Sequence, residues 1–362
     1  MKQLRPAAMH VVAGFGDVWS ALEHAYGDRR WLIVVDGNVL RHHQGMLRGL
    51  GRKRRKALVE LRAGEAVKRL GAVELLAAAA LDAGLDRGGL VVAVGGGTLC
   101  DLTGFFASMW MRGVEWVPVA TTTLSIADSA IGGKTAVNWK GSKNLLGHFH
   151  DPVAVYGVEG ALDTLPTRHY RAGLAEVVKS ALIADRRLFE RLEASADELR
   201  ARSAADLLDL LAAAAAIKCA VVVQDPREQG IRAHLNFGHT VGHALESLHR
   251  PRLYHGEAVA AGMIAASSLS ERLVGAPQGT TDRVAGLLER LGLLRVLSPV
   301  SFSTLWGVMT SDKKVAHGKL RVVLTPEIGT ATVTALESRP ALRQAVQEMQ
   351  RRCAVGAREN SR

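Results

Sequence analysis

Short apolar runs separated by helical patterns occupy the first half of the chain. The runs at residues 31–35 (WLIVV), 57–61, 90–94 (LVVAV) and 114–120 each predict a β-strand. Helical periodicity covers residues 39–50, residues 64–83 and the segment that begins at Asp101. Strands that are apolar at nearly every position are covered on both faces, so this alternation predicts a parallel sheet between two layers of helices.

The pattern becomes helical after about residue 165. Helices are predicted at residues 171–184, 187–200, 204–223, 232–249, 257–274 and 280–291, with a hairpin at 320–333. A chain of 362 residues is long for a single core. We therefore predict a Rossmann-like α/β domain at residues 1–165 and a mainly α-helical domain at residues 166–362.

Polar residues interrupt the apolar pattern of the helix predicted at 232–249. At ideal helical spacing, one face of it would carry Arg232, Asn236, His239 and His243. A third imidazole, His255, follows after a break. Burying such groups is costly unless each has a partner, and imidazole is the commonest protein ligand of zinc-like metals. A solvated face with scattered histidines is the alternative, but the flanking apolar residues are those of a packed helix. The pattern favours a polar pocket that holds a metal ion.

A carboxylate in the preceding helical region could complete this metal site. Glu176 and Lys179 are three residues apart in a segment of otherwise small and apolar residues. Such a pair is usually an ion pair on a helix surface. Set against the histidines, Glu176 becomes a candidate third ligand. Two imidazoles and one carboxylate leave a coordination position open, which is typical of a catalytic zinc-type site.

Two glycine-rich stretches predict contacts with anionic groups. Residues 95–97 (GGG) connect a buried strand to a helix, where the backbone can approach a pyrophosphate, although a plain tight turn is equally compatible with them. In residues 128–135 (DSAIGGKT), paired glycines between Asp128 and Lys134 predict a pliable loop that presents an ammonium group. Apolar neighbours favour a partly buried loop over a surface turn.

Composition indicates a soluble globular protein. Hydrophobic residues make up 48% of the chain and charged residues 22%, with no apolar run of bilayer-spanning length and no signal peptide. The three cysteines are widely spaced, so we expect neither disulfides nor a cysteine-based zinc site, and a reducing cytoplasm fits best. No membrane association is expected.

The net charge of +11 favours an anionic partner. Aromatic residues make up only 5% of the chain, and no stacking platform accompanies the basic residues, so we expect a small anionic substrate and no nucleic acid.

In combination, these segments resemble the 3-dehydroquinate synthase family of sugar phosphate cyclases. The resemblance runs in consistent order from about residue 31 to about residue 333. Its segments are GGGTLCDLTGF (95–105), RGVEWVPVATT (112–122), DSAIGGKTAVN (128–138), KNLLG (143–147), RAGLAEVVK (171–179), RAHLNFGHTVGHALE (232–246), HGEAVAAGM (255–263) and DKK (312–314). Each is modest alone, and their joint occurrence is specific. Ala120, Cys100 and residues 139–142 (WKGS) depart from the family pattern, which bears on the substrate more than on the reaction type.

The resemblance implies an NAD-binding domain, a helical domain that binds zinc or cobalt, and an active site between them. The implied metal ligands are Glu176, His239 and His255. The implied substrate-contacting and catalytic residues are Arg112, Asp128, Lys134, Asn144, Lys179, Lys218, Arg232, Asn236 and His243, with Lys313 or Lys314. The implied cofactor contacts are Asp36, Asn38, Glu65, Lys68, Gly96, Gly97, Asp101, Thr121, Thr122, Lys143 and Asn144. A homodimer is usual for such proteins and is expected here.

The implied reaction converts 3-deoxy-arabino-heptulosonate 7-phosphate to 3-dehydroquinate and phosphate, a step of the shikimate pathway to aromatic amino acids. It combines transient oxidation by NAD, phosphate elimination, re-reduction and intramolecular aldol closure. Arg232 and Asn236 suit a substrate carboxylate, which favours a heptulosonate over a carboxylate-free sugar. The alternatives are an amino-dehydroquinate synthase, a sedoheptulose 7-phosphate cyclase, an oxidoreductase of the glycerol-dehydrogenase type, and a non-catalytic paralogue that acts as a binding module.

Overall fold

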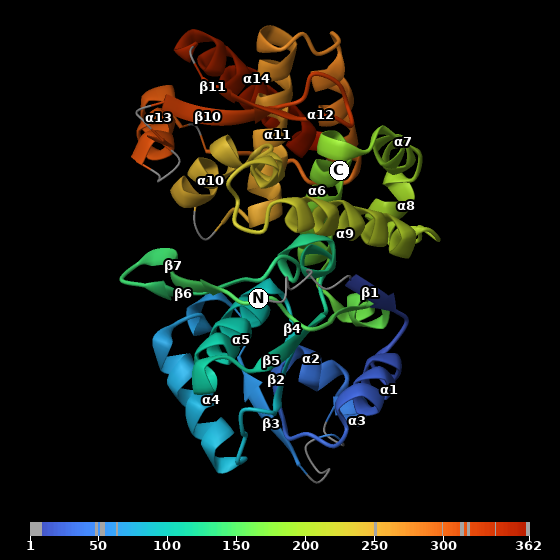
Figure 1. Cartoon of the computed structure of the whole chain (residues 1–362). Helices are drawn as coiled ribbons and strands as arrows, with labels where there is room; N and C mark the ends of the chain where they lie inside the picture. Colours follow the sequence, from blue (N-terminus) through green and yellow to red (C-terminus); the bar gives the residue numbers. More distant parts are fainter. Residues whose placement is uncertain are drawn as a thin grey trace. The chain divides into compact units, whose positions relative to one another are not determined.

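The chain folds into two compact units (Figure 1). The computed structural model describes residues 9–47, 50, 55–62, 64–249, 252–298, 300–311, 315–316, 319–336 and 338–359. Unit 1 comprises Met1–Tyr170 with Lys218–Val223, and unit 2 comprises Arg171–Ile217 with Gln224–Arg362. The boundary at residue 165 stays a prediction, and each unit is described by itself.

Unit 1 is built on a six-stranded parallel sheet with the strand order β1-β8-β5-β4-β2-β3. Its strands are β1 (Met9–Val12), β2 (Trp31–Asp36), β3 (Lys56–Leu61), β4 (Leu90–Gly95), β5 (Glu115–Ala120) and β8 (Val155–Val158). The four strands predicted from apolar runs are all present, and the predicted parallel sheet is confirmed. The edge strand β1 and its neighbour β8 were not predicted.

Helices cover both faces of this sheet, as predicted. They are α1 (Phe15–Tyr26), α2 (Gly37–His42), α3 (Gln44–Leu47), α4 (Leu70–Asp82) and α5 (Gly97–Met109). Alternate residues of β2 enter two separate cores: Leu32 and Val34 pack with α4 and α5, whereas Ile33 and Val35 pack with α1, α2 and α3. Burial on both faces explains why the central strands are apolar at every position.

Two helices of unit 1 begin away from their predicted positions. The helix predicted from residue 64 is first a 3-10 turn, η2 (Glu65–Val67), and α4 begins only at Leu70. Lys68 has a ψ of 66° and Arg69 is extended, with φ −144° and ψ 161°, so these two residues interrupt the predicted helix. In contrast, α5 begins at Gly97, four residues before the predicted start, because Gly96 is its N-cap.

The loop predicted at residues 128–135 is shorter than expected and covers residues 130–133, where Gly132 and Gly133 have φ values of 100° and 62°. Asp128 lies in the single helical turn η4 (Ser125–Ser129), and Lys134 begins strand β6 (Lys134–Trp139). Strand β6 pairs antiparallel with β7 (Ser142–Phe149). Short turns η3 (Trp110–Arg112) and η5 (Glu159–Thr164) complete unit 1.

Unit 2 is mainly helical, as predicted. Its helices are α6 (Thr167–Ala184, of which residues 167–170 belong to unit 1), α7 (Arg186–Ala194), α8 (Ala196–Ala201), α9 (Leu207–Gln224, of which residues 218–223 belong to unit 1), α10 (His239–Leu248), α11 (His255–Leu273), α12 (Thr280–Arg290), α13 (Phe302–Ser311) and α14 (Arg339–Glu359). The predicted hairpin is present as β10 (Lys319–Leu324) and β11 (Thr332–Ala335), with β9 (Val315–Ala316) beside β10. The helix predicted at 187–200 is divided at Ser195 into α7 and α8, and α13 and α14 were not predicted.

The single helix predicted at residues 232–249 is the most consequential error. Residues Ile231–Asn236 form the 3-10 turn η6, and α10 begins at His239. Between them, Gly238 has a φ of 76° and breaks the helix. Arg232 and Asn236 therefore do not share a helix face with His239 and His243.

Helix α9 is the one described helix that is long and apolar enough to span a bilayer. The core helix of a soluble protein satisfies the same criterion, so this is weak support for a membrane span. Its Lys218 is buried and forms an ion pair of 2.8 Å with Asp128 of unit 1, which is typical of a packed helix.

Candidate functional site

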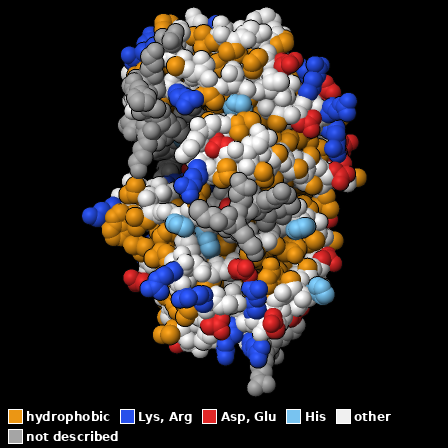
Figure 2. Space-filling model, in the orientation of Figure 1, with side chains coloured by type: hydrophobic (Ala, Val, Ile, Leu, Met, Phe, Trp, Pro, Cys, Tyr) orange, Lys and Arg blue, Asp and Glu red, His pale blue; other side chains and the backbone are white. Residues whose placement is uncertain are grey.

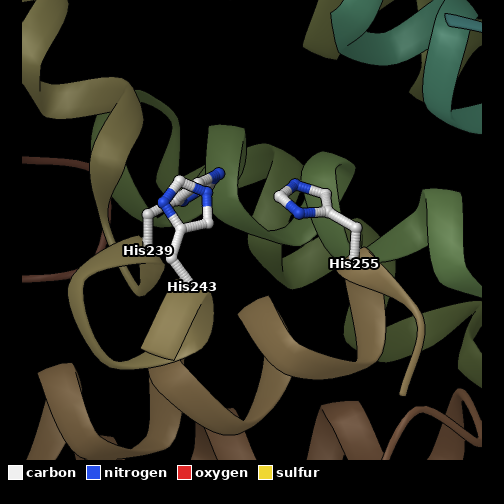
Figure 3. Close-up of side chains that lie close together, drawn as sticks. All are labelled: His239, His243 and His255. Atoms are coloured by element: carbon white, nitrogen blue, oxygen red, sulfur yellow. The ribbon is translucent and has the colours of Figure 1, made fainter. Parts of the chain in front are cut away.

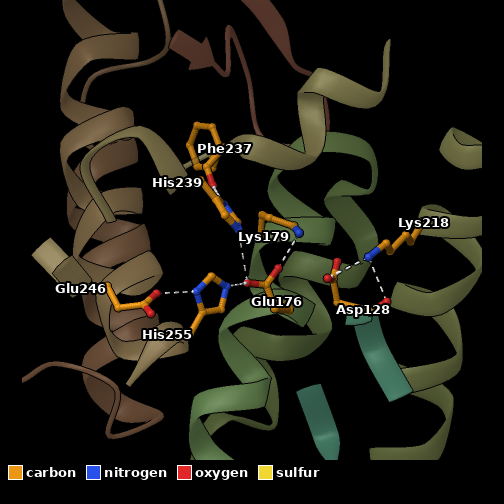
Figure 4. A network of polar contacts seen from close by, with 8 residues as sticks. All are labelled: Asp128, Glu176, Lys179, Lys218, Phe237, His239, Glu246 and His255. Atoms are coloured by element: carbon orange, nitrogen blue, oxygen red, sulfur yellow. Dashed lines mark hydrogen bonds and ion pairs between the residues drawn. The ribbon is translucent and has the colours of Figure 1, made fainter. Parts of the chain in front are cut away.

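Three predicted metal ligands from distant parts of the sequence lie together in unit 2 (Figure 4). The Nε2 atoms of His239 and His255 lie 3.7 and 3.4 Å from the same oxygen, Oε1 of Glu176. Glu176 comes from the middle of α6, whereas the two histidines are the first residues of α10 and α11. Both distances exceed those of normal hydrogen bonds. Within the described part of the chain, neither carboxylate oxygen of Glu176 has a hydrogen-bonding partner of normal geometry, although both are buried.

Close backbone contact between helices brings the histidines to this point. Gly262 of α11 lies against the break before α10, and a Cβ atom there would lie 1.9 Å from the carbonyl oxygen of Gly238. The start of α11 is fixed separately, because Glu257 accepts hydrogen bonds from the Tyr254 backbone N–H (2.9 Å) and from Arg295 (2.7 Å). The buried carboxylate of Glu257 thus holds the turn that carries His255.

Hydrogen bonds on the far side of each ring set the tautomers. His255 Nδ1 lies 3.0 Å from Glu246 Oε2, and His239 Nδ1 lies 3.0 Å from the Phe237 carbonyl oxygen. Both partners are acceptors, so each Nδ1 carries the proton and each Nε2 keeps its lone pair toward Glu176 when the ring is neutral. A carboxylate or carbonyl behind a ligating imidazole is the usual outer support of a metal site.

His243 gives the site a fourth candidate donor. One nitrogen from each of His239, His243 and His255 lies within 4.8 Å of the others, and Figure 3 shows the rings of the first two on one side of the cluster and that of His255 on the other. His243 follows His239 by one turn of α10. The geometry is therefore compatible with His243 near a bound ion, either as a ligand or facing the substrate.

The charges around Glu176 favour its ionised form. Burial alone would raise the pKa of Glu176, but the ammonium group of Lys179 and the nearby imidazoles hold it well below its usual value. Burial lowers the pKa of His239 to about 3. For His255, burial acts in the same direction, but the negative charges of the nearby Glu176 and Glu246 carboxylates outweigh it and raise the pKa to about 9. Without a bound ion, the protonated imidazole ring of His255 lies between the carboxylates of Glu176 and Glu246.

This set of groups fits a divalent metal ion. One buried carboxylate without a hydrogen bond of normal geometry and two imidazoles with aligned Nε2 atoms match the ligand types of a catalytic zinc site. The same imidazole and carboxylate ligands can also bind Co2+. The fit rests on Glu176, His239 and His255, the three predicted ligands, and their assignment as ligands is taken up below as a proposal.

Predicted cofactor residues of unit 1 gather at the carboxyl edge of the sheet. β2, β4 and β5 are neighbours, and in the register Gly95 lies beside Ala120, the last residue of β5. The groups that follow these strands are Asp36 and Asn38 after β2, Gly96 and Gly97 after β4, and Thr121 and Thr122 after β5. In open parallel sheets, this edge is where nucleotides bind, with phosphate at a helix N-terminus such as that of α5.

Charged side chains form a second cluster in unit 1. Lys68 Nζ donates to Asp101 Oδ2 and to Asn144 Oδ1, both at 2.5 Å. Burial raises the pKa of Asp101, and Lys68 opposes this effect. Glu65 lies beside the start of α5, where its Oε2 accepts a hydrogen bond of 3.4 Å from Thr98. Four of the predicted cofactor residues are thus in or next to one network.

The predicted substrate contacts are divided between the units. Asp128, Lys218, Lys134, Arg112 and Asn144 belong to unit 1, and Lys179, Arg232, Asn236 and His243 belong to unit 2. Lys143, a predicted cofactor contact, also belongs to unit 1. Arg232 is buried and donates to the Pro226 carbonyl (2.5 Å), and Asn236 donates to Glu228 (2.9 Å). Lys313 and Lys314 lie outside the described residues. The predicted site between two domains stays a prediction.

Sequence reasoning missed two residues of these networks. Glu246 follows His239 by seven residues, which places both on one face of α10, and that spacing was the available signal. Asn138 forms hydrogen bonds with two other segments of unit 1, and its role depends on a strand pairing that the sequence pattern did not reveal.

Comparison with protein-family models identifies both halves of the chain. A model described as 3-dehydroquinate synthase N-terminal matches residues 58–172, and one described as 3-dehydroquinate synthase C-terminal matches residues 173–315. A 3-dehydroquinate synthase of Nostoc punctiforme is 44% identical over 290 residues, covering 79% of this chain and 80% of that protein.

Solved structures of similar proteins include two other cyclases. A 2-epi-5-epi-valiolone synthase from Streptomyces hygroscopicus, solved with NAD+ and Zn2+ bound, superposes with a TM-score of 0.87 at 28% identity, covering 97% of this chain and 98% of that one. A 2-deoxy-scyllo-inosose synthase complexed with carbaglucose-6-phosphate, NAD+ and Co2+ has a TM-score of 0.80 at 24% identity, covering 94% and 96%, and this likeness shows the fold alone.

Proposed function

Because the chain belongs to the 3-dehydroquinate synthase family, we propose that it converts 3-deoxy-arabino-heptulosonate 7-phosphate to 3-dehydroquinate and phosphate. The observation that supports this most directly is the convergence of His239 and His255 on one oxygen of Glu176. The product of this reaction is an intermediate on the route to aromatic amino acids, and the cytoplasm is the proposed place of action.

The proposed cofactors are NAD and a divalent ion, zinc or cobalt. Glu176, His239 and His255 would hold the ion, and the carboxyl edge of the sheet with Glu65, Lys68 and Asp101 would hold NAD. When bound, NAD accepts and returns a hydride, and the ion polarises the hydroxyl or carbonyl group that it contacts. The protein's part is to position these groups and to neutralise charge.

Basic residues of the chain supply the charge complementarity that the substrate needs. Lys134, Lys218 and Arg112 would bind phosphate oxygens and stabilise the charge that builds up as phosphate leaves. Lys179 is almost fully buried beside Glu176, so its ammonium group is rigidly held near the reacting carbons. His243, with a ring less buried than that of His239, is the proposed proton-transfer group.

Arg232 and Asn236 are proposed to select a substrate with a carboxylate. Both lie in η6, shortly before helix α10, which carries His239 and His243. A guanidinium group and an amide together match a carboxylate in geometry and charge. A neutral polyol, as in a glycerol dehydrogenase, has no use for this pair or for the lysines.

The test is to incubate purified protein with 3-deoxy-arabino-heptulosonate 7-phosphate, NAD and Zn2+ or Co2+. We expect stoichiometric release of phosphate and formation of 3-dehydroquinate without net accumulation of NADH. Release of phosphate only from an aminated analogue or from sedoheptulose 7-phosphate would instead assign the protein to a sister cyclase. Net NADH accumulation with a simple polyol would assign it to the oxidoreductases.

A homodimer and a domain boundary near residue 165 also belong to this proposal. The family models change over between residues 172 and 173, which is close to that boundary. Sedimentation velocity of the purified protein tests the dimer, and a species of about twice 38.7 kDa is expected.

A further inference from the structure

The hairpin of β6 and β7 loses its regular pairing at Asn138. Val137 pairs with Leu146, but the next paired residues are Trp139 and Ser142. Asn138 alone therefore lies opposite residues 143–145, which makes this a β-bulge in β7. Within the bulge, Asn144 has a φ of 52°, a conformation that asparagine tolerates better than most residues. Bulges of this kind often redirect side chains toward a functional site.

Asn138 forms three hydrogen bonds with two other segments. Its backbone N–H donates to the carbonyl oxygen of Lys68 (2.8 Å), and its side-chain Nδ2 donates to Glu65 Oε1 (2.8 Å). Its Oδ1 accepts from the backbone N–H of Asn144 (2.9 Å). One carboxamide thus connects the η2 turn to the bulge.

These contacts close a ring, because the segments that Asn138 joins are also joined directly. Lys68 Nζ donates to Asn144 Oδ1 and to Asp101 Oδ2. All members of the ring belong to unit 1. Without Asn138, the bulge and the η2 turn would be connected through the flexible Lys68 side chain, which has many accessible rotamers.

We propose that Asn138 is a positioning residue for the bound dinucleotide. It fixes Glu65, Lys68 and Asn144, three of the groups assigned to the cofactor, in one arrangement before the cofactor arrives. This inference rests on the proposed function. The carboxamide serves both partners at once, because its Nδ2 donates to Glu65 while its Oδ1 accepts from the Asn144 N–H.

The experiment compares Asn138→Ala and Asn138→Asp with wild type, using the full chain loaded with Zn2+. The dissociation constant for NAD+ is measured by calorimetry, and hydrogen exchange is followed at residues 143–146 in the absence of NAD+. Ser142→Ala, which changes an exposed side chain next to the same bulge, is the matched control.

For Asn138→Ala, we expect NAD+ to bind at least tenfold more weakly and residues 143–146 to exchange faster. Asn138→Asp keeps the acceptor for the Asn144 N–H but places a second carboxylate next to that of Glu65. We therefore expect weaker NAD+ binding, with hydrogen exchange at residues 143–146 close to that of wild type. At saturating NAD+, kcat should return most of the way to the wild-type value, whereas the KM for NAD+ stays raised. Ser142→Ala should match wild type in every measurement.

One result would overturn the inference. Unchanged NAD+ affinity in both variants, with only a lower melting temperature, would show that Asn138 supports the fold and no more. If Asn138→Ala does not fold, Asn138→Asp carries the decision alone, since it keeps the size of the side chain and the bond to Asn144. A wild-type protein that binds no NAD+ would instead contradict the proposed function itself.

Discussion

The carboxylate of Glu246 orients the imidazole ring of His255, a proposed metal ligand. This carboxylate accepts the Nδ1 proton of His255 and directs Nε2 toward Glu176. We predict that Glu246→Gln lowers the affinity for Zn2+ by about 10- to 100-fold, as is usual when the outer support of a metal ligand loses its charge. Competition with a chromogenic chelator measures this affinity.

The control for Glu246→Gln is Glu190→Gln, which removes a carboxylate from an exposed ion pair with Arg186 on α7. Its Zn2+ affinity and the NAD+ affinity of both variants should match wild type. Equal Zn2+ affinity in Glu246→Gln and wild type would mean that the orientation of His255 does not depend on this carboxylate.

Replacing Lys179 is predicted to strengthen metal binding, whereas Glu246→Gln is predicted to weaken it. Lys179 is the buried cation beside the buried carboxylate of Glu176. In metal-free protein, Lys179→Met removes the ammonium group beside buried Glu176 and leaves the more distant imidazole of His255 as its cationic neighbour, so we predict a loss of about 3–5 kcal/mol in the free energy of unfolding. Because one positive charge is removed from the site, Zn2+ should bind more tightly and restore most of this stability, while cyclase activity is lost.

Denaturant unfolding of Lys179→Met without and with Zn2+ tests both the predicted loss of stability and its recovery on metal binding. A variant that is equally destabilised with and without the ion would contradict the placement of the ion next to Glu176. The contrast with Glu246→Gln, which weakens metal binding, separates a change in charge at the site from general damage to unit 2.

At the level of secondary-structure elements, sequence periodicity locates helices but not the breaks in their backbone. The polar stripe of residues 232–249 correctly indicated a polar pocket, and His239 and His243 do share one face of α10. Arg232 and Asn236 were placed on that face because the pattern cannot reveal the positive φ of Gly238. The convergence of Glu176 with the histidines is a tertiary contact: the residue types made Glu176 a candidate ligand, and the family resemblance implied the set Glu176, His239 and His255.

The β6–β7 hairpin was missed for a related reason. The paired glycines before Lys134 led to the prediction of a loop at residues 128–135, although Thr135, Val137 and Trp139 alternate with other residues as in a strand. Lys140 and Gly141, with φ values of 45° and 79°, form its tight turn, and a glycine between two alternating segments was the available signal. The bulge opposite Asn138 depends on hydrogen bonds with the η2 turn and could not be read from local sequence.

The crossing of α10 and α11 depends on the absence of a side chain at Gly262. An alanine Cβ there would lie 1.9 Å from the backbone oxygen of Gly238, and backbone cannot move aside as a side chain does. We predict that Gly262→Ala costs at least about 1–3 kcal/mol in the free energy of unfolding and weakens Zn2+ binding, because the two helices carry His239 and His255.

Gly286→Ala in α12 is the matched control for Gly262→Ala. Nothing lies within 4 Å of the position that its Cβ would take, so the same substitution should stabilise the protein by about 0.5–1 kcal/mol through helix propensity. Denaturant unfolding compares the two variants. Equal effects at both positions would contradict the close backbone contact at Gly262.

At the scale of the whole molecule, the parallel sheet, the helical second half and the family were predicted correctly, and the family models and the fold confirm them. On the face in Figure 2, the described Lys and Arg side chains lie among Asp and Glu side chains. What the sequence could not provide is the network of each site, since those contacts join residues up to 79 positions apart, as Glu176 and His255 do.

The division of the two predicted sites between units leads to a prediction on metal removal. All candidate ligands belong to unit 2, whereas the Lys68–Asp101–Asn144 network belongs to unit 1. Chelation should therefore abolish cyclase activity, lower the melting temperature and speed hydrogen exchange in α6, α10 and α11, with little change in β2, β4 and β5. At 100 times its dissociation constant, the ion contributes about 2.7 kcal/mol of stability. NAD+ affinity should persist in the metal-free protein, and Zn2+ or Co2+ should restore activity. Loss of NAD+ affinity and of protection in β4 on chelation would show that the ion stabilises the nucleotide edge of unit 1 as well, and the two sites would then have to be treated as one.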